Sequence, residues 1–429
     1  MRTQSQNRTY ALVIIGMLFF IFGFVTWLNG TLIPFLKLAC QLETDTEAFF
    51  VTFAFYMAYF FLALPGSYVL KKTGFKDGMA YGLLAMAVGS LIFIPAANSR
   101  SFGLFLTGLF VQGAGLALLQ TAVNPYVSIL GPIESAAKRI SIMGICNKVA
   151  GMLSPLVLSA LVLRNATEIE TQILTTTDLV QKNILLDELS KRVIMPYVVM
   201  AIVLVVVALL IKKSSLPEIE AEEEVEDAVH VKRTSVFQFP YLILGVICLF
   251  VYVGVEVIAG DAIGMYGKHM GMPLDQTKYF TSFTLSAMLV GYVVGIFTIP
   301  KYLSQQKALA ISAILGIIFS VMVFLTDGYV AIVFIALLGL ANALMWPAIF
   351  PLAIEGLGKF TKMGSALLIM AIAGGAIFPI MYAGLRDHLN LSNPLSFLLC
   401  AFPAYAYILF YALKGHEIGK RSKSARAEI

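Results

Sequence analysis

Amide side chains recur inside the apolar stretches of this 429-residue sequence, where polar groups are costly and most often serve a function. Gln120 and Asn124 stand four residues apart, so on a helix they share one face. Asn29, Asn147 and Asn342 lie within three other apolar stretches. A primary amide carries both donors and an acceptor on one planar group, which suits the hydroxyls of a sugar. These residues predict a site for a small polyhydroxylated molecule.

The sequence has only two tryptophans, and each lies within about one helical turn of one of these asparagines. Trp27 precedes Asn29, and Trp346 follows Asn342. An indole ring can cover the apolar C–H face of a sugar. Buried amides also join helices, and tryptophans are frequent at membrane interfaces, so each residue alone has a structural alternative. Taken as a set, the amides and indoles are expected to line one pocket.

Three ionisable residues within the apolar stretches are candidates for ion coupling. Glu256 and Asp261 belong to one stretch, and a carboxyl group there can bind and release a proton or coordinate a sodium ion. Asp261 lies near the end of its stretch, where hydration is an alternative, whereas Glu256 lies deeper. Lys148, next to Asn147, either extends to water along its own stem or points inward as a fixed cation.

The sequence lacks the patterns of a soluble enzyme. Its four histidines lie outside the apolar stretches, and it has neither a phosphate-binding Gly-Lys-Ser/Thr loop nor a serine nucleophile elbow. Its four cysteines have no paired spacing, which argues against disulfides and zinc. The basic residues are dispersed among short loops, which argues against nucleic-acid binding. We expect no enzymatic activity, no metal ion and no organic cofactor.

Membrane-spanning helices must position the polar groups. Hydrophobic residues make up 59% of the chain and charged residues only 13%, with a mean hydropathy of +0.86. Each apolar stretch is long enough to cross a hydrocarbon core of about 30 Å. The prediction is an all-α membrane protein in the lipid bilayer with twelve spans, over residues 10–36, 48–70, 77–97, 102–130, 142–163, 193–211, 238–263, 278–300, 308–326, 329–352, 364–385 and 394–413.

A charged linker divides these spans six from six. Its many glutamates predict a solvated connector. The predicted organisation is an N-terminal six-helix half over residues 1–211, the linker over 212–236, a C-terminal six-helix half over 237–413 and a tail over 414–429.

The two halves also share short patterns at one offset. Gly115-Leu-Ala recurs at Gly339, and the glycine and proline of Gly151-x-x-x-Pro recur at Gly375, in both cases 224 residues later. Chance similarity between apolar sequences is the alternative. Together with the six-plus-six layout, the matches predict two pseudo-symmetric halves, as in many secondary transporters.

Charge distribution predicts the orientation. With the N-terminus inside, 20 of the 30 Lys and Arg residues lie on the cytoplasmic side and nine on the other. The positive-inside rule favours this arrangement. We expect a monomer in the cell (inner) membrane with both termini in the cytoplasm.

Three segments carry a family resemblance. They read Thr26-Trp-Leu-Asn-Gly-Thr-Leu-Ile-Pro, Gln120-Thr-Ala-Val-Asn-Pro-Tyr-Val-Ser-Ile-Leu-Gly-Pro and Arg139-Ile-Ser-Ile-Met-Gly-Ile-Cys-Asn-Lys. The chain resembles the fucose/galactose/glucose:proton symporter family of the major facilitator superfamily, and its glucose/galactose branch more than its fucose branch. The resemblance implies two six-helix halves, alternating access around a central site and a hexose substrate.

The sequence departs from the fucose branch at two positions. That branch has an aspartate in its first helix and a glutamate in its fourth, where this chain has Gly30 and Gln120. Neither residue can carry a proton, so coupling must rest on the two carboxyl groups of the seventh span or be absent. The resemblance implies sugar contact at Asn29, Gln120, Asn124 and Asn147.

The predicted function is uptake of a hexose, glucose or galactose, by cation-coupled symport with H+ or Na+ and alternating access. An uncoupled sugar facilitator and an exporter of another small polar or amphiphilic molecule are the alternatives.

Overall fold

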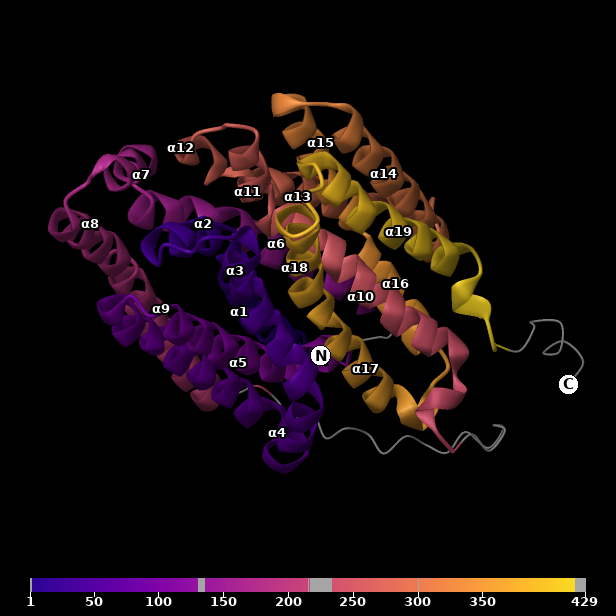
Figure 1. Ribbon diagram of the computed structural model, residues 1–429. Helices are drawn as coiled ribbons and strands as arrows, with labels where there is room; N and C mark the ends of the chain where they lie inside the picture. The colour runs from indigo at the N-terminus through magenta and orange to yellow at the C-terminus, as the bar shows by residue number, and fades with distance from the viewer. Residues whose placement is uncertain (1, 130–135, 215, 217–233, 300, 421–429) are drawn as a thin grey trace, which may run out of the picture.

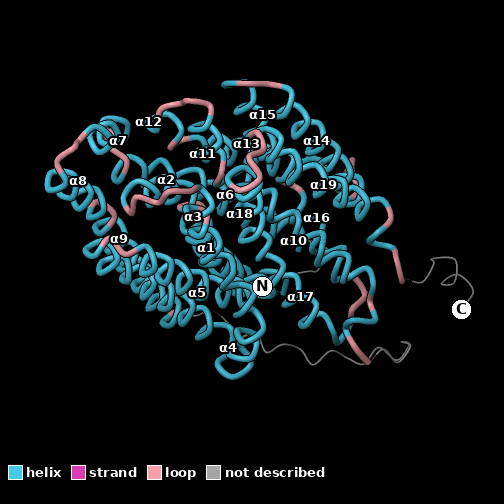
Figure 2. The backbone as a smooth tube through the Cα atoms, in the orientation of Figure 1, coloured by secondary structure: helices cyan, strands magenta, loops and turns pink. Residues whose placement is uncertain are grey.

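The computed structural model describes residues 2–129, 136–214, 216, 234–299 and 301–420. Within these ranges all regular structure is helical (Figure 2). Since lipid offers no partner for backbone N–H and C=O groups, helices that bond internally are one of only two ways to cross it. The first nine helices are α1 (Arg2–Thr26), α2 (Asn29–Ala39), α3 (Asp45–Ala48), α4 (Phe50–Ser99), α5 (Phe102–Ile129), α6 (Ala136–Val162), α7 (Ala166–Thr175), α8 (Leu179–Lys191) and α9 (Ile194–Lys213).

The second set of helices begins after the charged linker. Most of that linker, at 215 and 217–233, lies outside the described residues, as does the end of the tail at 421–429. The later α-helices are α10 (Pro240–Asp261), α11 (Ile263–His269), α12 (Leu274–Thr277), α13 (Phe280–Thr298), α14 (Gln305–Leu325), α15 (Gly328–Asn342), α16 (Met345–Ile354), α17 (Thr361–Met370), α18 (Gly374–Asp387) and α19 (Asn393–Leu413). Short 3-10 helices are η2 (Val236–Gln238), η3 (Gly358–Phe360), η4 (Ala371–Ala373) and η5 (Gly415–Glu417).

Two of the twelve predicted spans are joined in α4. Eleven helices among the described residues are long and apolar enough to cross a membrane, but α4 has 50 residues. About 20 suffice for one crossing. Gly74 interrupts α4 with φ 80° and ψ 170°, a conformation that only glycine adopts readily. The predicted spans at 48–70 and 77–97 therefore lie on either side of Gly74.

The spans form two groups (Figure 1). Helices α4, α5 and α9 pack together on one side of the molecule, and α14, α15 and α19 pack together on the other. Between them lie α1, α6, α10, α13 and α18, and the α6–α13 and α4–α18 contacts join the two groups. This is the expected arrangement of two helical halves around a central site.

Three spans that the sequence predicts as continuous are interrupted near the middle of the molecule. The first breaks between α1 and α2 at Trp27 and Leu28, the second between α15 and α16, and the third at η4 between α17 and α18. Pro347 lies in the first turn of α16, where its missing N–H costs no helical hydrogen bond. Discontinuous helices are a common way to build transporter binding sites.

Short helices gather at one end of the bundle. Helices α3, α7, α11 and α12 follow or precede membrane spans there, and α7 packs against both α8 and α12. Figure 1 shows α7, α8, α11 and α12 along one edge of the molecule. We refer to this end as the α7 end.

Glycines on α5 let it approach α4 closely. A Cβ at Gly113 would lie 2.2 Å from the carbonyl oxygen of Phe55, and one at Gly115 would lie 2.4 Å from that of Gly82. Both are far below van der Waals contact, so these positions accept no side chain unless the backbone moves.

Replacing Gly115 with alanine should lower the melting temperature of the purified protein, because overpacking typically costs about 1–3 kcal/mol. Gly103→Ala on the same helix is the control, since a Cβ there meets nothing within 4 Å. Thermal unfolding in detergent measures both. Equal melting temperatures for the two variants would show that the α4–α5 contact is looser than described.

Candidate functional site

A cavity of 130 Å³ lies between the two helical halves, smaller than the roughly 300–1,000 Å³ typical of ligand sites. All three span interruptions reach it, through Trp27, Trp346 with Pro347, and Ile372. Its polar and charged lining consists of Thr26, Gln120, Asn124, Asn147, Lys148 and Glu256, and its aromatic lining of Phe19, Phe22, Trp27, Tyr56, Tyr59, Tyr252, Tyr292 and Trp346.

Three of the predicted amides meet on this wall. Gln120 and Asn124 come from one face of α5, as their spacing predicts, and Asn147 comes from α6. The Nε2 of Gln120 donates to the hydroxyl of Tyr59 at 3.0 Å, and the Nδ2 of Asn147 donates to the carbonyl of Phe19 at 3.3 Å. Each of these two bonds uses one donor of its amide and leaves the carbonyl oxygen able to accept from a ligand.

The other two predicted amides are not on the cavity wall. Asn29 is 1% exposed, and its amide has no hydrogen-bond partner among the described residues. Asn342 is fully buried, and its Oδ1 accepts from the hydroxyl of Tyr405 at 2.9 Å. Contact between these two amides and a ligand stays a prediction. Helical periodicity indicates the face of a residue only where the helix is continuous, and a helix break lies next to each of these residues.

The two tryptophans differ in surroundings. Trp346 lines the cavity and stacks on Phe350, with ring centroids 5.9 Å apart. Trp27 also reaches the cavity but is 2% exposed, and the Nζ of Lys148 lies 4.8 Å from its ring centroid. Only Trp346 therefore has the open surroundings expected of a ring that stacks on a ligand.

Lys148 and Glu256 form an ion pair across the cavity. The Nζ of Lys148, on α6, lies 2.9 Å from Oε1 of Glu256, on α10, and both side chains are about nine-tenths buried. Lys148 thus points inward, and the alternative that it extends to water is wrong. Removing two charges from water is costly unless they are paired, so each side chain holds the other in place.

Asp261 is more deeply buried than Glu256. Its exposed fraction is 0%, against 8% for Glu256, so the alternative that water hydrates Asp261 is wrong. It does not line the cavity and takes part in no ion pair among the described side chains. The helix that carries it ends against α2 rather than in solvent. The position of Asp261 near the end of its apolar stretch suggested a location at the membrane interface. The sequence does not reveal that α2 covers this end of α10.

Four tyrosines on the wall were not anticipated from the sequence. Tyr56 and Tyr59 come from α4, Tyr252 from α10 and Tyr292 from α13. Tyr56 and Tyr59 are three residues apart inside an apolar span, which places both hydroxyls on one face. That spacing was a usable signal. Hydroxyl groups add to the donors and acceptors that the amides bring to this cavity.

A second ionic network closes the α7 end. The carboxylate of Asp45, on α3, contacts Lys37 of its own half and both His269 and Arg386 of the other half. Burial alone would raise the pKa of Asp45, but the hydrogen bond from His269 and the charges of Arg386 and Lys37 hold that pKa well below its usual range. Asp45 therefore stays ionised at neutral pH.

Further polar contacts cross between the halves beside Asp45. The backbone N–H and the hydroxyl of Thr46 both donate to Asp387 at 2.9 Å. Glu170, on α7, pairs with Lys268, and Asp275 accepts from the backbone N–H of Thr167 at 3.1 Å. The two halves are thus held together at the α7 end.

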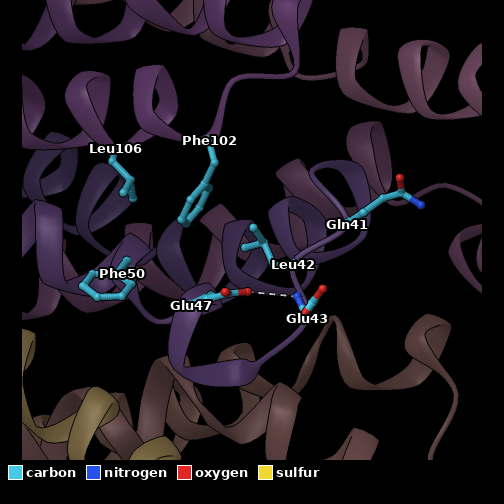
Figure 3. A pocket seen from close by; sticks show the side chains of 7 residues that line it. All are labelled: Gln41, Leu42, Glu43, Glu47, Phe50, Phe102 and Leu106. Atoms are coloured by element: carbon cyan, nitrogen blue, oxygen red, sulfur yellow. Dashed lines mark hydrogen bonds between the residues drawn. The ribbon is translucent and has the colours of Figure 1, made fainter.

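A larger hollow of 570 Å³ lies on the surface near α3 (Figure 3). Apolar side chains, two glutamates and Gln41 line it, and the carboxylate of Glu47 accepts from the backbone N–H of Glu43 at 2.9 Å. Glu47 also completes a capping box with Thr44 at the start of α3. Glu47 thus serves to cap a helix, and the described lining of this hollow includes neither an ion pair nor tyrosines, unlike that of the central cavity.

The family model of the Major Facilitator Superfamily matches residues 15–380 of this chain. The chain belongs to this superfamily. It is therefore a multi-pass membrane transporter rather than an enzyme. Among curated relatives, it is 34% identical to a glucose/galactose transporter of Brucella abortus over 417 residues, which cover 96% of each chain. It is 32% identical to a putative glucose/galactose transporter of Helicobacter pylori over 96% of this chain and 98% of the relative.

The fucose branch of the superfamily is also similar. An L-fucose-proton symporter of Escherichia coli is 27% identical over 86% of each chain. The crystal structure of FucP in its outward conformation has a TM-score of 0.75 and 26% identity, covering 97% of this chain and all of the other. A D-xylose-proton symporter, with a TM-score of 0.67 and 16% identity, shares the fold. The family resemblance seen in the sequence is confirmed.

The ion pair predicts a strongly non-additive pair of substitutions. Lys148→Met alone and Glu256→Gln alone should each lower the free energy of unfolding by up to about 3–5 kcal/mol, because each leaves one group buried without its partner. The double variant should recover a large part of that loss. Thermal unfolding of the four proteins measures the coupling, and additive losses would mean that the two groups do not interact.

Proposed function

We propose that this transporter takes up a hexose, glucose or galactose, together with a proton, by alternating access. The observation that carries the proposal is the Lys148–Glu256 ion pair, which joins the two halves across an amide-lined cavity. Relatives at 34% and 32% identity are named glucose/galactose transporters. A more distant relative is named a fucose-proton symporter, which supports a proton as the coupling ion.

In this proposal the sugar occupies the central cavity. Gln120, Asn124 and Asn147 hold its hydroxyl groups, and Trp346 covers its apolar face. Two adjacent hydroxyls of a hexose can each donate to one amide oxygen and accept from one amide N–H. A cavity of mixed amides, tyrosines and one indole suits a small polar ligand better than a large amphiphile.

Coupling rests on Glu256 and its partner. Protonation of Glu256 neutralises the carboxylate and removes the attraction that holds it to Lys148. Release of that proton to the opposite aqueous phase lets the ion pair form again. The ion pair thus forms only when Glu256 is deprotonated. Opening and closing of the two halves is therefore coupled to proton uptake and release.

Asp261 is proposed as a second coupling group on the same helix. It lies just over one turn beyond Glu256, fully buried. An isolated ionised carboxylate in such surroundings is strongly unfavourable, so this group is carried in its neutral, protonated form in this state. Exposure to water in another state of the cycle would let the proton leave.

Orientation and location complete the proposal. We place the transporter in the cell (inner) membrane as a monomer with both termini in the cytoplasm, so that the α7 end faces outside. The excess of Lys and Arg on the opposite side supports this choice. Closure of the α7 end by the Asp45 network then means that the structure is shut toward the outside.

Uptake of labelled glucose into proteoliposomes under an inward proton gradient, an inward sodium gradient, both or neither tests the proposal. We expect accumulation only with the proton gradient. An inward-moving charge gains about 2.3 kcal/mol per 100 mV of membrane potential, enough to concentrate the sugar several-fold. Equilibration without accumulation would make the protein a facilitator, and absence of any hexose uptake would mean that the cavity binds another molecule.

Glu256→Gln should keep exchange of sugar across the membrane and abolish its accumulation, because the amide mimics the protonated carboxyl but cannot release a proton. Counterflow and gradient-driven uptake in the same proteoliposomes separate the two activities. Full accumulation by this variant would remove Glu256 from the coupling mechanism.

Gln120→Ala should raise the sugar Kd about five- to thirtyfold, since a lost hydrogen bond in a buried site is worth about 1–2 kcal/mol. Thr121→Ala is the matched control. Its hydroxyl bonds to Ala117 of its own helix at 2.7 Å and does not line the cavity. Equilibrium binding of labelled glucose compares them, and an unchanged Kd in Gln120→Ala would take this residue out of the site.

A further inference from the structure

The indole of Trp27 fills a slot between two glycines that belong to different halves. A Cβ at Gly260, on α10, would lie 2.3 Å from Cζ3 of Trp27. A Cβ at Gly151, on α6, would lie 2.4 Å from its Cδ1. These atoms are on opposite edges of the ring, so the indole extends from one helix to the other. Neither position can bear a side chain while Trp27 stays in place.

The slot lies directly beside the central ion pair. Gly151 follows Lys148 by three residues on α6, and Gly260 follows Glu256 by four on α10. Spacings of three and four place each glycine about one turn beyond its charged neighbour on the same helix face. On both helices that direction runs toward the α7 end. Trp27 thus covers the ion pair on the side that the Asp45 network closes.

Contacts tie Trp27 to both halves at once. The Nζ of Lys148 lies 4.8 Å from its ring centroid, a cation–π distance. It shares a buried apolar cluster with Leu285, Met288 and Tyr292, which belong to α13 of the opposite half. Trp27 itself sits at the break between α1 and α2, so its ring is not fixed by a continuous helix. The slot exists only while the two halves are together.

From this geometry we infer that Trp27 is the central plug of the transporter, which closes the sugar site toward the outside and senses the Lys148–Glu256 pair. The inference rests on the proposed function for the direction of closure. When α10 moves away from α6, the ion pair and the slot open in one step, because the same two helices form both. Trp27 is thus a positioning residue for Lys148 and a barrier above the cavity, rather than a ring that stacks on the sugar.

Another glycine on α10 offers a matched control. A Cβ at Gly254 would lie 2.3 Å from Cγ of Phe378, the same clearance as at Gly260. Phe378 belongs to α18, in the same half as α10. A methyl group at Gly254 therefore disturbs packing within one half in every state of the cycle. A methyl group at Gly260 acts only where the halves meet.

The sequence supplies its own reporter, because Trp27 and Trp346 are the only tryptophans. In a Trp346→Phe background all indole fluorescence comes from Trp27. Its emission wavelength and its quenching by acrylamide, measured on the purified full-length protein, report whether the plug is seated. The measurement needs neither sugar nor an ion gradient, so its result is independent of whether the substrate is a hexose.

Gly151→Ala and Gly260→Ala should each shift the emission to longer wavelength and raise the quenching constant several-fold, because the indole can no longer enter the slot. Gly254→Ala should leave both unchanged while it lowers the melting temperature. If Gly260→Ala keeps the parent emission and quenching, or if Gly254→Ala changes them equally, the plug proposal is wrong.

Glu256→Gln tests the link to the ion pair without adding volume. Loss of the attraction to Lys148 should favour separation of the halves and again raise quenching of Trp27 several-fold. Identical quenching of parent and variant would show that closure of the slot does not depend on this charge.

Discussion

The structure depends on one interaction, the ion pair between Lys148 and Glu256 in the interior of a membrane-spanning bundle. Neither charge is stable there alone, so Nζ of Lys148, on α6 of one half, lies 2.9 Å from Oε1 of Glu256, on α10 of the other. That approach brings Gly151 and Gly260 together around Trp27 one turn away, and it narrows the cavity below. Charge, packing and access to the cavity therefore change together.

Much of the fold could be predicted because its causes are local. Apolar stretches of sufficient length must be helices in lipid, and an amide at i and another at i+4 must share a face. Gln120 and Asn124 accordingly lie together on the cavity wall. The length of α4 also accommodates the two predicted spans once the interruption at Gly74 is known.

The rest of the site depends on contacts between distant parts of the chain. Lys148 and Glu256 are 108 residues apart, and nothing in either local sequence names the other as its partner. The break after α1 rotates Asn29 away from the cavity, and the hydroxyl of Tyr405 holds the amide of Asn342. Asp261 is buried because α10 ends against α2, and its position in the sequence does not reveal this contact.

The α7 end and the cavity are closed by different means. At the rim, Lys37 and His269 remain about a third exposed where they contact Asp45, so dissolved ions reach those contacts. The central pair is nine-tenths buried beneath an indole and is shielded from them. Since salt screens exposed charges far more than buried ones, the outer closure weakens in a saline medium while the inner one does not. The transporter thus keeps one seal whose strength is independent of the salt concentration of its surroundings.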